Sequence, residues 1–270
     1  MTIIKSKDNP HIKLYLKLAG SKKERKNYGM YVLEGYRLVV DALMEDSKIA
    51  SLFLTESAYE KYSSELSQAD LREVNVLIIS NELGIRISST EKTQGVFAIC
   101  RAAAEKEFEA SAKSDGKYIV LYQLQDPGNV GMIIRTADAV GIDGIILSES
   151  CELYNPKVVR STMGSLFRVN IFPDENIEKI ITTMQEKRIT TYAAVVDSDA
   201  QSLSQQIFGP GSAVLIGNEG NGLPDDISSK CDKRVTIKMK GNVNSLNAAM
   251  ATGIFMWEMT KGNHRQKYGQ

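Results

Sequence analysis

The chain has 270 residues, with 33 basic and 33 acidic side chains and 43% hydrophobic residues. These values are ordinary for a folded globular protein and exclude the disordered, collagen-like and coiled-coil classes. The net charge of zero argues against a protein that coats nucleic acid through bulk positive charge, and the length predicts about two domains.

The cysteines and the N-terminus indicate the compartment. Cys100, Cys151 and Cys231 are widely separated and form no Cys-x-x-Cys pair, which is not the pattern of a disulfide framework or a zinc site. The N-terminus has no apolar signal core, and no apolar run approaches the roughly 18 residues that span a bilayer. We therefore expect a cytoplasmic protein without a membrane segment or a metal ion.

The neutral total conceals a basic segment at the N-terminus. Residues 1–26 carry eight basic and two acidic side chains, a net charge of +6, so the rest of the chain sums to −6. Two interpretations remain open for this segment: a surface that follows RNA phosphates, or the solvated face of an ordinary helix. The buried side of such a helix would comprise Ile12, Leu14, Tyr15, Leu16 and Leu18.

The N-terminal part of the chain alternates short apolar runs with helical stretches, which predicts a small α/β domain over residues 1–101. A helix is expected over residues 34–43. The expected strands cover residues 30–33, 50–54, 74–79 and 96–100. Residues 102–116 have no strong apolar face and are interpreted as a linker.

Residues 117–270 predict a second α/β domain with a parallel sheet. Its strands are nearly continuous apolar runs, which is typical of parallel sheets covered by helices on both faces. The expected strands cover residues 118–122, 144–147, 167–172, 191–196, 213–216 and 235–237. The expected helices cover residues 130–139, 156–163, 176–187 and 248–259. Such sheets bind ligands where the loops leave the carboxyl ends of the strands.

The first loop of interest follows the strand at residues 118–122. Pro127 and Gly128 predict a turn, and Asn129 is a plausible N-cap of the next helix. Arg135 is placed on the side of that turn, where its long side chain could reach back over the loop. Taken alone, Asn129 is better explained as a plain helix cap, and Arg135 as half of a surface ion pair, than as functional residues.

Two further loops are rich in glycine and asparagine. Gly217, Gly220 and Gly222 follow a buried strand and allow a ligand close to the backbone, although a plain glycine turn remains open. Their spacing matches neither a Rossmann fingerprint nor a P-loop. In the third loop, Asn244 or Ser245 would cap the apolar C-terminal helix.

Three motifs in this order resemble those of the SpoU (TrmH) branch of the SPOUT RNA methyltransferases. They are Asp126-Pro-Gly-Asn-Val-Gly-Met-Ile-Ile-Arg135, Ile216-Gly-Asn-Glu-Gly-Asn-Gly222 and Ser245-Leu-Asn247. The resemblance extends to Asn155-Pro-Lys157-Val-Val-Arg160, Gly164 and Phe167-Arg168. Asn9-Pro10, Glu34-Gly35-Tyr-Arg37 and Gly95-Val96 resemble the small substrate-binding domain, similar to a ribosomal protein, that precedes the catalytic domain in many members. Met132 and Asn244 depart from the family pattern.

The resemblance implies an α/β SPOUT domain with a parallel sheet and a deep trefoil knot. It implies S-adenosylmethionine as cofactor, methyl transfer to a ribose 2′-hydroxyl of RNA, and a homodimer whose sites lie at the subunit interface. The residues it implies for the reacting side are Asn129, Arg135, Glu219, Ser245 and Asn247. Those it implies for the cofactor are Gly217, Asn218, Gly220, Gly222, Ile237 and Leu246.

Charge then suggests where RNA is held. The expected phosphate contacts are Lys13, Lys17, Lys22, Lys23, Arg25, Arg37, Lys157 and Arg160. By family analogy we favour large-subunit rRNA over tRNA as the substrate. The alternatives are a tRNA 2′-O-methyltransferase and a non-catalytic RNA-binding protein of ribosome assembly with the same fold.

Overall fold

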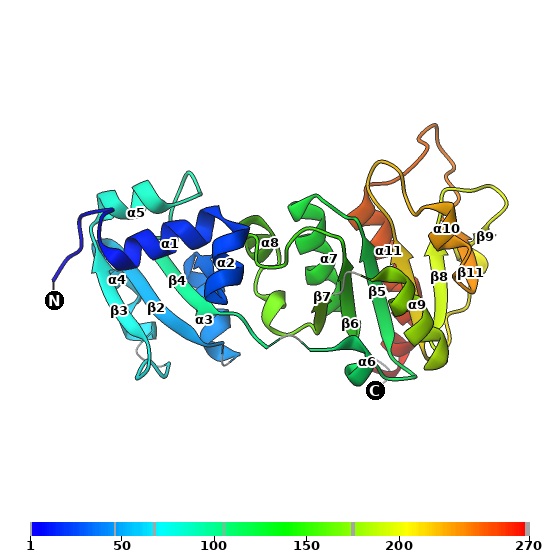
Figure 1. Cartoon of the computed structure of the whole chain (residues 1–270), viewed down its shortest axis with the longest axis horizontal. Coiled ribbons are helices and arrows are strands. Elements are labelled where there is room, and N and C mark those ends of the chain that lie inside the picture. Colours follow the sequence, from blue (N-terminus) through cyan, green and yellow to red (C-terminus); the bar gives the residue numbers. More distant parts are fainter. Residues whose placement is uncertain (1, 46, 67–68, 105, 174–175, 268–270) are drawn as a thin grey trace. The chain divides into compact units, whose positions relative to one another are not determined.

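The chain divides into two compact units, which Figure 1 shows in a computed structural model. The structure describes residues 2–45, 47–66, 69–104, 106–173 and 176–267. The N-terminal unit comprises Met1–Ala104 together with Glu152–Arg168, and the C-terminal unit comprises Glu105–Cys151 and Val169–Gln270.

The N-terminal unit is built on a four-stranded mixed sheet. Its strands, in spatial order, are β1 (Met30–Glu34), β4 (Val96–Arg101), β2 (Ile49–Thr55) and β3 (Asn75–Ile79). The β2–β3 pair is parallel, and the other two pairs are antiparallel. The helices before and between these strands are α1 (Pro10–Gly20), α2 (Lys22–Tyr28), α3 (Tyr36–Met44), α4 (Glu56–Leu66) and α5 (Asn81–Ile87). The expected α/β domain is therefore confirmed.

The basic N-terminal segment forms α1 and α2. The side chain of Asn9 caps α1 by accepting a hydrogen bond from the His11 N–H, and Pro10 occupies the first helical position. Ile12, Tyr15 and Leu18 are spaced at three residues and are all buried in the core of the unit. The lysines of this segment lie on the opposite, exposed side of the helices.

The C-terminal unit carries a seven-stranded sheet in which every pair is parallel. Its strands, in spatial order, are β7 (Ile171–Pro173), β6 (Gly144–Ser148), β5 (Lys117–Tyr122), β10 (Ser212–Ile216), β8 (Thr190–Ala194), β11 (Lys233–Thr236) and β9 (Gln201–Ser202). The predicted parallel sheet is confirmed. The two-residue β9 has no apolar run to reveal it in the sequence.

Helices cover both faces of this sheet. On one face, α9 (Ile177–Glu186) joins a core with Val120, Ile146 and Leu215. Successive strand residues point to opposite faces, so Ile119 and Val214 face the other side. There α7 (Pro127–Val140) and α11 (Ala248–Lys267) pack against each other and against β6 and β10. The remaining short helices are α6 (Phe108–Ser111), α8 (Pro156–Ser161) and α10 (Asp225–Ser228).

The segment between β6 and β7 differs from the prediction in two ways. Residues 152–168, assigned from the sequence to the C-terminal domain, belong to the N-terminal unit, where α8 packs against β1. The strand expected over residues 167–172 is wrong at its start, because Ser165–Phe167 forms a 3₁₀ turn and the strand begins at Ile171. Packing against a sheet that is distant in the sequence overrides the local apolar pattern here.

Candidate functional site

The loops after β5, β10 and β11 leave the same edge of the sheet, because all three strands are parallel. In the first loop, the side chain of Asp126 accepts a hydrogen bond from the Asn129 N–H at 2.8 Å and caps α7. The prediction of Asn129 as the cap is therefore wrong. Because Asp126 does the capping, the Asn129 amide is available for other contacts.

Asn129 joins the three motif loops through its side chain. It is only 7% exposed. Its Nδ2 donates to Glu219 Oε1 at 3.3 Å, and its Oδ1 accepts from Asn247 Nδ2 at 2.9 Å. Residues separated by up to 118 positions in the sequence thus form one continuous chain of hydrogen bonds.

The direction of this chain follows from its two ends. A carboxylate such as that of Glu219 only accepts hydrogen bonds, so the amide nitrogen of Asn129 must face it. At the other end, Asn247 Oδ1 accepts from the N–H groups of Ala249 and Met250 at 2.9 and 3.2 Å. Asn247 therefore caps α11, which corrects the expectation that Asn244 or Ser245 does so. Its Nδ2 is left to donate to Asn129.

Glu219 fastens the second loop to the first. Its carboxylate accepts hydrogen bonds from the backbone N–H of Asp126 at 2.9 Å and of Gln125 at 3.2 Å, in addition to that from Asn129. Burial disfavours the charged form, but the hydrogen bonds from Asp126, from its own backbone, from Gln125 and from Asn129 outweigh it. The pKa of Glu219 therefore lies below its usual value.

The second loop closes tightly on itself. Asn218 and Gly222 exchange two backbone hydrogen bonds, of 3.1 and 2.9 Å. A Cβ atom on buried Gly217 would lie 2.1 Å from the backbone of Gly222, so only glycine fits this position. The side chain of Asn218 donates to the Gln123 carbonyl and accepts from the Gly220 N–H, both at 2.9 Å. These contacts shape the backbone that the sequence assigns to the cofactor.

Three more residues assigned to the cofactor or the reacting side, Ile237, Ser245 and Leu246, lie on the loop after β11. Ile237 and Leu246 are half-buried, and Ser245 is exposed. Sequence reasoning missed the loop after β8, the strand between β10 and β11, which leaves the same edge of the sheet. Val196 on that loop is 75% exposed, because β8 ends at Ala194, whereas the sequence places it inside the expected strand 191–196.

Arg135 lies outside the hydrogen-bond chain. Its side chain is exposed on α7 and makes no hydrogen bond or ion pair with any residue in the described part of the chain. Near it on the same helix, Met132 is 45% exposed. On the adjacent α11, an exposed apolar stripe comprises Met250, Ile254 and Trp257. Phe255, between them on the same helix, is by contrast buried.

The residues predicted to contact RNA differ in how accessible their side chains are to a phosphate. Lys17, Lys22, Lys23, Arg37 and Lys157 are exposed. Lys13 is exposed and pairs with Asp8 at 2.8 Å. Arg160 is partly exposed and lies 3.6 Å from Glu34 and 2.5 Å from Ser89 Oγ.

Arg25 is not available to bind phosphate. Its side chain is 6% exposed, and its Nε and Nη2 donate to the two carboxylate oxygens of Glu152 at 2.8 and 2.6 Å. Its Nη1 donates to the Leu18 carbonyl at 2.6 Å. The prediction of Arg25 as an RNA contact is wrong, because composition reveals its charge and not its burial.

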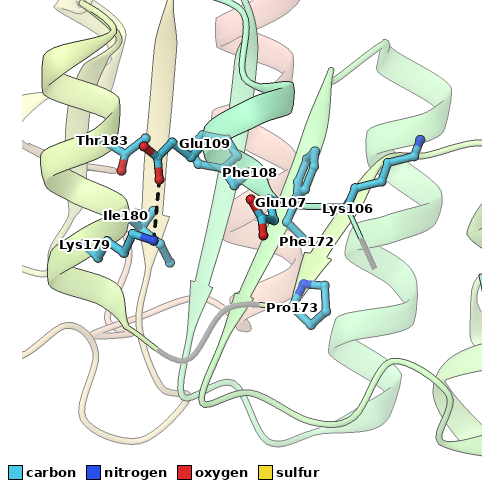
Figure 2. A pocket seen from close by; sticks show the side chains of 9 residues that line it. All are labelled: Lys106, Glu107, Phe108, Glu109, Phe172, Pro173, Lys179, Ile180 and Thr183. Carbon is cyan, nitrogen blue, oxygen red and sulfur yellow. Dashed lines mark ion pairs between the residues drawn. The ribbon is translucent and has the colours of Figure 1, made fainter. Parts of the chain in front are cut away.

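A pocket elsewhere in the C-terminal unit is separate from the motif loops. It has a volume of about 390 Å³, and Figure 2 shows it between α6, β7 and α9, with Lys179 and Glu109 paired across it at 3.5 Å. None of its lining residues belongs to the three motifs. In the described ranges, no group of three or more His, Cys, Asp or Glu side chains is arranged to hold a metal ion. None of the helices described has the length and apolar character of a membrane span.

Comparison with known protein families matches both parts of the chain. Residues 116–257 match the SpoU rRNA Methylase family, and residues 9–98 match the MRM3-like substrate binding domain. The chain belongs to the SpoU rRNA methylase family. The resemblance inferred from the three motifs is thus confirmed.

Curated relatives of this SpoU family chain align over nearly its whole length. One is the 23S rRNA (guanosine(2553)-2′-O)-methyltransferase RlmP of Bacillus subtilis, 28% identical, with 96% of this chain and 99% of the relative covered. Another is an uncharacterised tRNA/rRNA methyltransferase of Synechocystis sp., 30% identical, with 94% and 92% covered.

Solved structures of other proteins share the fold. The AdoMet-bound rRNA methyltransferase from Sinorhizobium meliloti has a TM-score of 0.82 and 28% identity, with 99% of this chain and 98% of that chain covered. A TrmH-family RNA methyltransferase of Porphyromonas gingivalis has a TM-score of 0.81 and 29% identity, with 94% and 98% covered.

The hydrogen bonds of Glu219 predict a pH-dependent stability. Because its folded pKa lies below its unfolded value of about 4.3, the contribution of the carboxylate is complete above that pH and is lost as pH falls through the folded pKa. Glu219→Gln should lower the free energy of unfolding by about 1 kcal/mol at pH 7, and by less as the pH falls below about 4. Denaturant unfolding at several pH values measures this difference.

The matched control is Glu186→Gln, which changes an exposed carboxylate on α9. It should leave stability unchanged at every pH. A Glu219→Gln penalty that stays constant, or grows, on acidification would contradict the assigned role of the carboxylate.

Proposed function

We propose that the chain is an S-adenosylmethionine-dependent methyltransferase that modifies a ribose 2′-hydroxyl in large-subunit rRNA. The observation that carries this proposal is the hydrogen-bond chain of Asn247, Asn129 and Glu219, which assembles the three family motifs into one site. The name of the B. subtilis relative supports the 2′-oxygen and 23S rRNA, and an rRNA substrate favours a cytoplasmic location. The trefoil knot implied by the family remains part of the proposal.

The residues at this edge fit S-adenosylmethionine. Neighbouring strands lie about 4.8 Å apart, so the loops after β10, β8 and β11 span about 10 Å, the size of a nucleoside. Half-buried Ile237 and Leu246 offer apolar contacts, while the exposed main-chain carbonyl groups of Gly220 and Gly222 have lone pairs left to accept hydrogen bonds. The cofactor, when bound, supplies an electrophilic methyl group on a sulfonium.

In our proposal the protein aligns the ribose and stabilises the charge that develops on it. In-line displacement needs the hydroxyl oxygen, the methyl group and the sulfur aligned, and positioning can supply several kcal/mol. Arg135 is always protonated and so cannot be the general base. Because its guanidinium is exposed and unpaired among the described residues, it can stabilise the developing alkoxide and hold the adjacent phosphate.

Glu219 is an unsuitable proton acceptor in the same reaction. Three N–H donors already bind its carboxylate, and they hold its pKa below the usual value. A group that is stabilised as an anion accepts a proton less readily. We therefore assign Glu219 to the positioning of Asn129 and the first loop. In this proposal the substrate phosphate or water takes the proton.

The first test of this mechanism is Arg135→Ala. We expect the rate of methyl transfer to fall by about 10²- to 10³-fold, as when one stabilising donor is removed from a transition state. Because Arg135 makes no hydrogen bond or ion pair with the motif loops among the described residues, the affinity for S-adenosylmethionine, measured by calorimetry, should stay within about twofold. Loss of cofactor binding together with activity would instead make Arg135 a structural residue.

RNA binding is assigned to the exposed lysines of α1 and α2. Lys17, Lys22 and Lys23 lie on the solvent side of helices whose other side is buried in the N-terminal unit. A match to a substrate binding domain over residues 9–98 supports the same surface. Phosphate contacts by lysines also explain how a chain of zero net charge can bind RNA.

Charge reversal tests this surface. Lys22→Glu combined with Lys23→Glu should weaken RNA binding by at least about tenfold at low salt. It should also reduce the slope of log affinity against log salt by about 1 to 2 units, because two phosphate contacts are lost. Filter binding over a salt series measures both. The control variant reverses the charges of Lys113 and Lys187, two lysines of the C-terminal unit. An unchanged salt slope in the variant with Lys22→Glu and Lys23→Glu would exclude α2 from the RNA surface.

We also assign a homodimer to the face formed by α7 and α11. Met250, Ile254 and Trp257 follow the spacing of a helical stripe and are 60%, 38% and 53% exposed. A contiguous apolar stripe of this kind marks an interaction surface. Covering it with a second copy would bring Arg135, on the adjacent helix, to the edge of the interface.

Sedimentation velocity tests the dimer. The mass of the wild-type protein obtained from sedimentation should be that of a dimer, twice the 29.8 kDa mass of the chain. Met250→Glu should sediment as a monomer, because a charge would be buried at the contact. Met44→Glu, which changes a methionine that is 78% exposed in the N-terminal unit, should leave the dimer intact. A monomeric wild-type protein, or a dimeric Met250→Glu variant, would contradict the assignment.

A further inference from the structure

The backbone of Gln123 takes a left-handed conformation at the point where β5 ends. Its φ is +55°, in a region that favours glycine and costs other residues free energy. Glu149, directly after the neighbouring strand β6, has a φ of +49°. Such strained positions cluster at functional sites, where the surrounding contacts hold them in place.

The left-handed turn directs the two backbone polar groups of Gln123 to opposite neighbours. In an extended strand, the N–H and the carbonyl of one residue point to the same side and bind the same neighbouring strand. The N–H of Gln123 continues the ladder between β5 and β6 by donating to the Ser148 carbonyl at 2.9 Å. Its carbonyl instead accepts from Asn218 Nδ2 at 2.9 Å, and Asn218 follows β10, which borders β5 on the other side. The turn at Gln123 therefore brings its carbonyl to Asn218.

Asn218 transmits this contact to the backbone of the second loop. Because its Nδ2 is bound to the Gln123 carbonyl, its Oδ1 faces the loop and accepts from the N–H groups of Gly220 at 2.9 Å and of Asn221 at 3.4 Å. Asn218 and Gly222 then close the loop through their two backbone hydrogen bonds. If the Gln123 carbonyl moved away, the side chain that holds Gly220 would be released.

Neighbouring side chains hold the left-handed turn in place. Gln123 Nε2 donates to Glu149 Oε2 at 2.7 Å and to the hydroxyl oxygen of Tyr122 at 3.2 Å. Glu149 is held in turn, because its carbonyl accepts from Gln125 Nε2 at 2.8 Å. All of these residues, and the second loop, belong to the C-terminal unit.

We propose that Gln123 is a positioning residue of the cofactor site. Its left-handed backbone holds Asn218, and through Asn218 the loop at residues 217–222, in the shape that binds S-adenosylmethionine. The proposal rests on the function proposed above and deepens it, because it names what sets the affinity of that site for its cofactor. A loop that already has its bound shape loses less conformational freedom on binding, so it binds more tightly.

The test separates the backbone of Gln123 from its side chain. Gln123→Val removes the amide and should also turn the carbonyl away from Asn218, because a β-branched residue disfavours the left-handed region. We expect the affinity for S-adenosylmethionine, measured by calorimetry, to fall about tenfold, the factor that corresponds to the cost of that conformation. Gln123→Gly removes the same amide but adopts the conformation freely, so its affinity should stay within about twofold of wild type.

Amide hydrogen exchange measures the shape of the loop without the cofactor. In Gln123→Val, exchange in a peptide covering residues 217–223 should become about tenfold faster, because the Gly220 N–H loses its acceptor. In Gln123→Gly, it should stay within about twofold of wild type. The matched control is Arg188→Val, which places the same residue at another left-handed position of this unit, with a φ of +61°. It should lower stability and change neither the cofactor affinity nor exchange in the loop.

The outcomes separate this proposal from the proposed function. Exchange in Gln123→Val as slow as in wild type, or equal losses in Gln123→Val and Gln123→Gly, overturns the role of the Gln123 backbone. A wild-type protein that does not bind S-adenosylmethionine overturns the proposed function instead, and exchange still decides whether Gln123 holds the loop.

A second variant applies if Gln123→Val does not fold. Asn218→Asp keeps an acceptor for the Gly220 N–H and removes the donor to the Gln123 carbonyl. Exchange in the same peptide should become faster than in wild type. Unchanged exchange there overturns the proposal.

Discussion

The side-chain amide of Asn129 is the contact on which the site depends. It is buried, and it donates to a carboxylate on one loop while accepting from an amide that caps a helix on another. The Glu219 carboxylate can only accept hydrogen bonds, and the Oδ1 of Asn247 is already used to cap α11. The hydrogen bonds of the chain can therefore run in only one direction. Hydrogen bonds in such a chain polarise one another, and removing either neighbour leaves a polar group of buried Asn129 unsatisfied.

The parallel sheet makes this contact possible. Asn129, Glu219 and Asn247 are far apart in the sequence, but each follows a strand that ends at the same edge. The strands supply rigidity, whereas the loops supply polar groups and exposed main chain. Closure of the Asn218–Gly222 turn and the cap at Asp126 then fix the two loops on either side of Glu219.

Sequence reasoning succeeded where the information is local or periodic. Apolar strands without alternation predicted the parallel sheet, and the ordered motifs predicted the family. It failed at Asn129, because two residues in one turn can both cap a helix and only the tertiary structure decides which is free. It also failed at Arg25, whose partner Glu152 is 127 positions away. The exposed stripe on α11 looked like core because the sequence does not show which apolar face remains uncovered.

A double-mutant cycle on methyl transfer tests most directly whether the three motif loops act as one unit. The cycle combines Glu219→Gln with Asn247→Ala, whose side chains are joined through Asn129. Residues that act as a unit give strongly non-additive effects. We predict that the double variant is slower than the more damaged single variant by no more than about twofold. Rate losses that simply multiply would contradict the account.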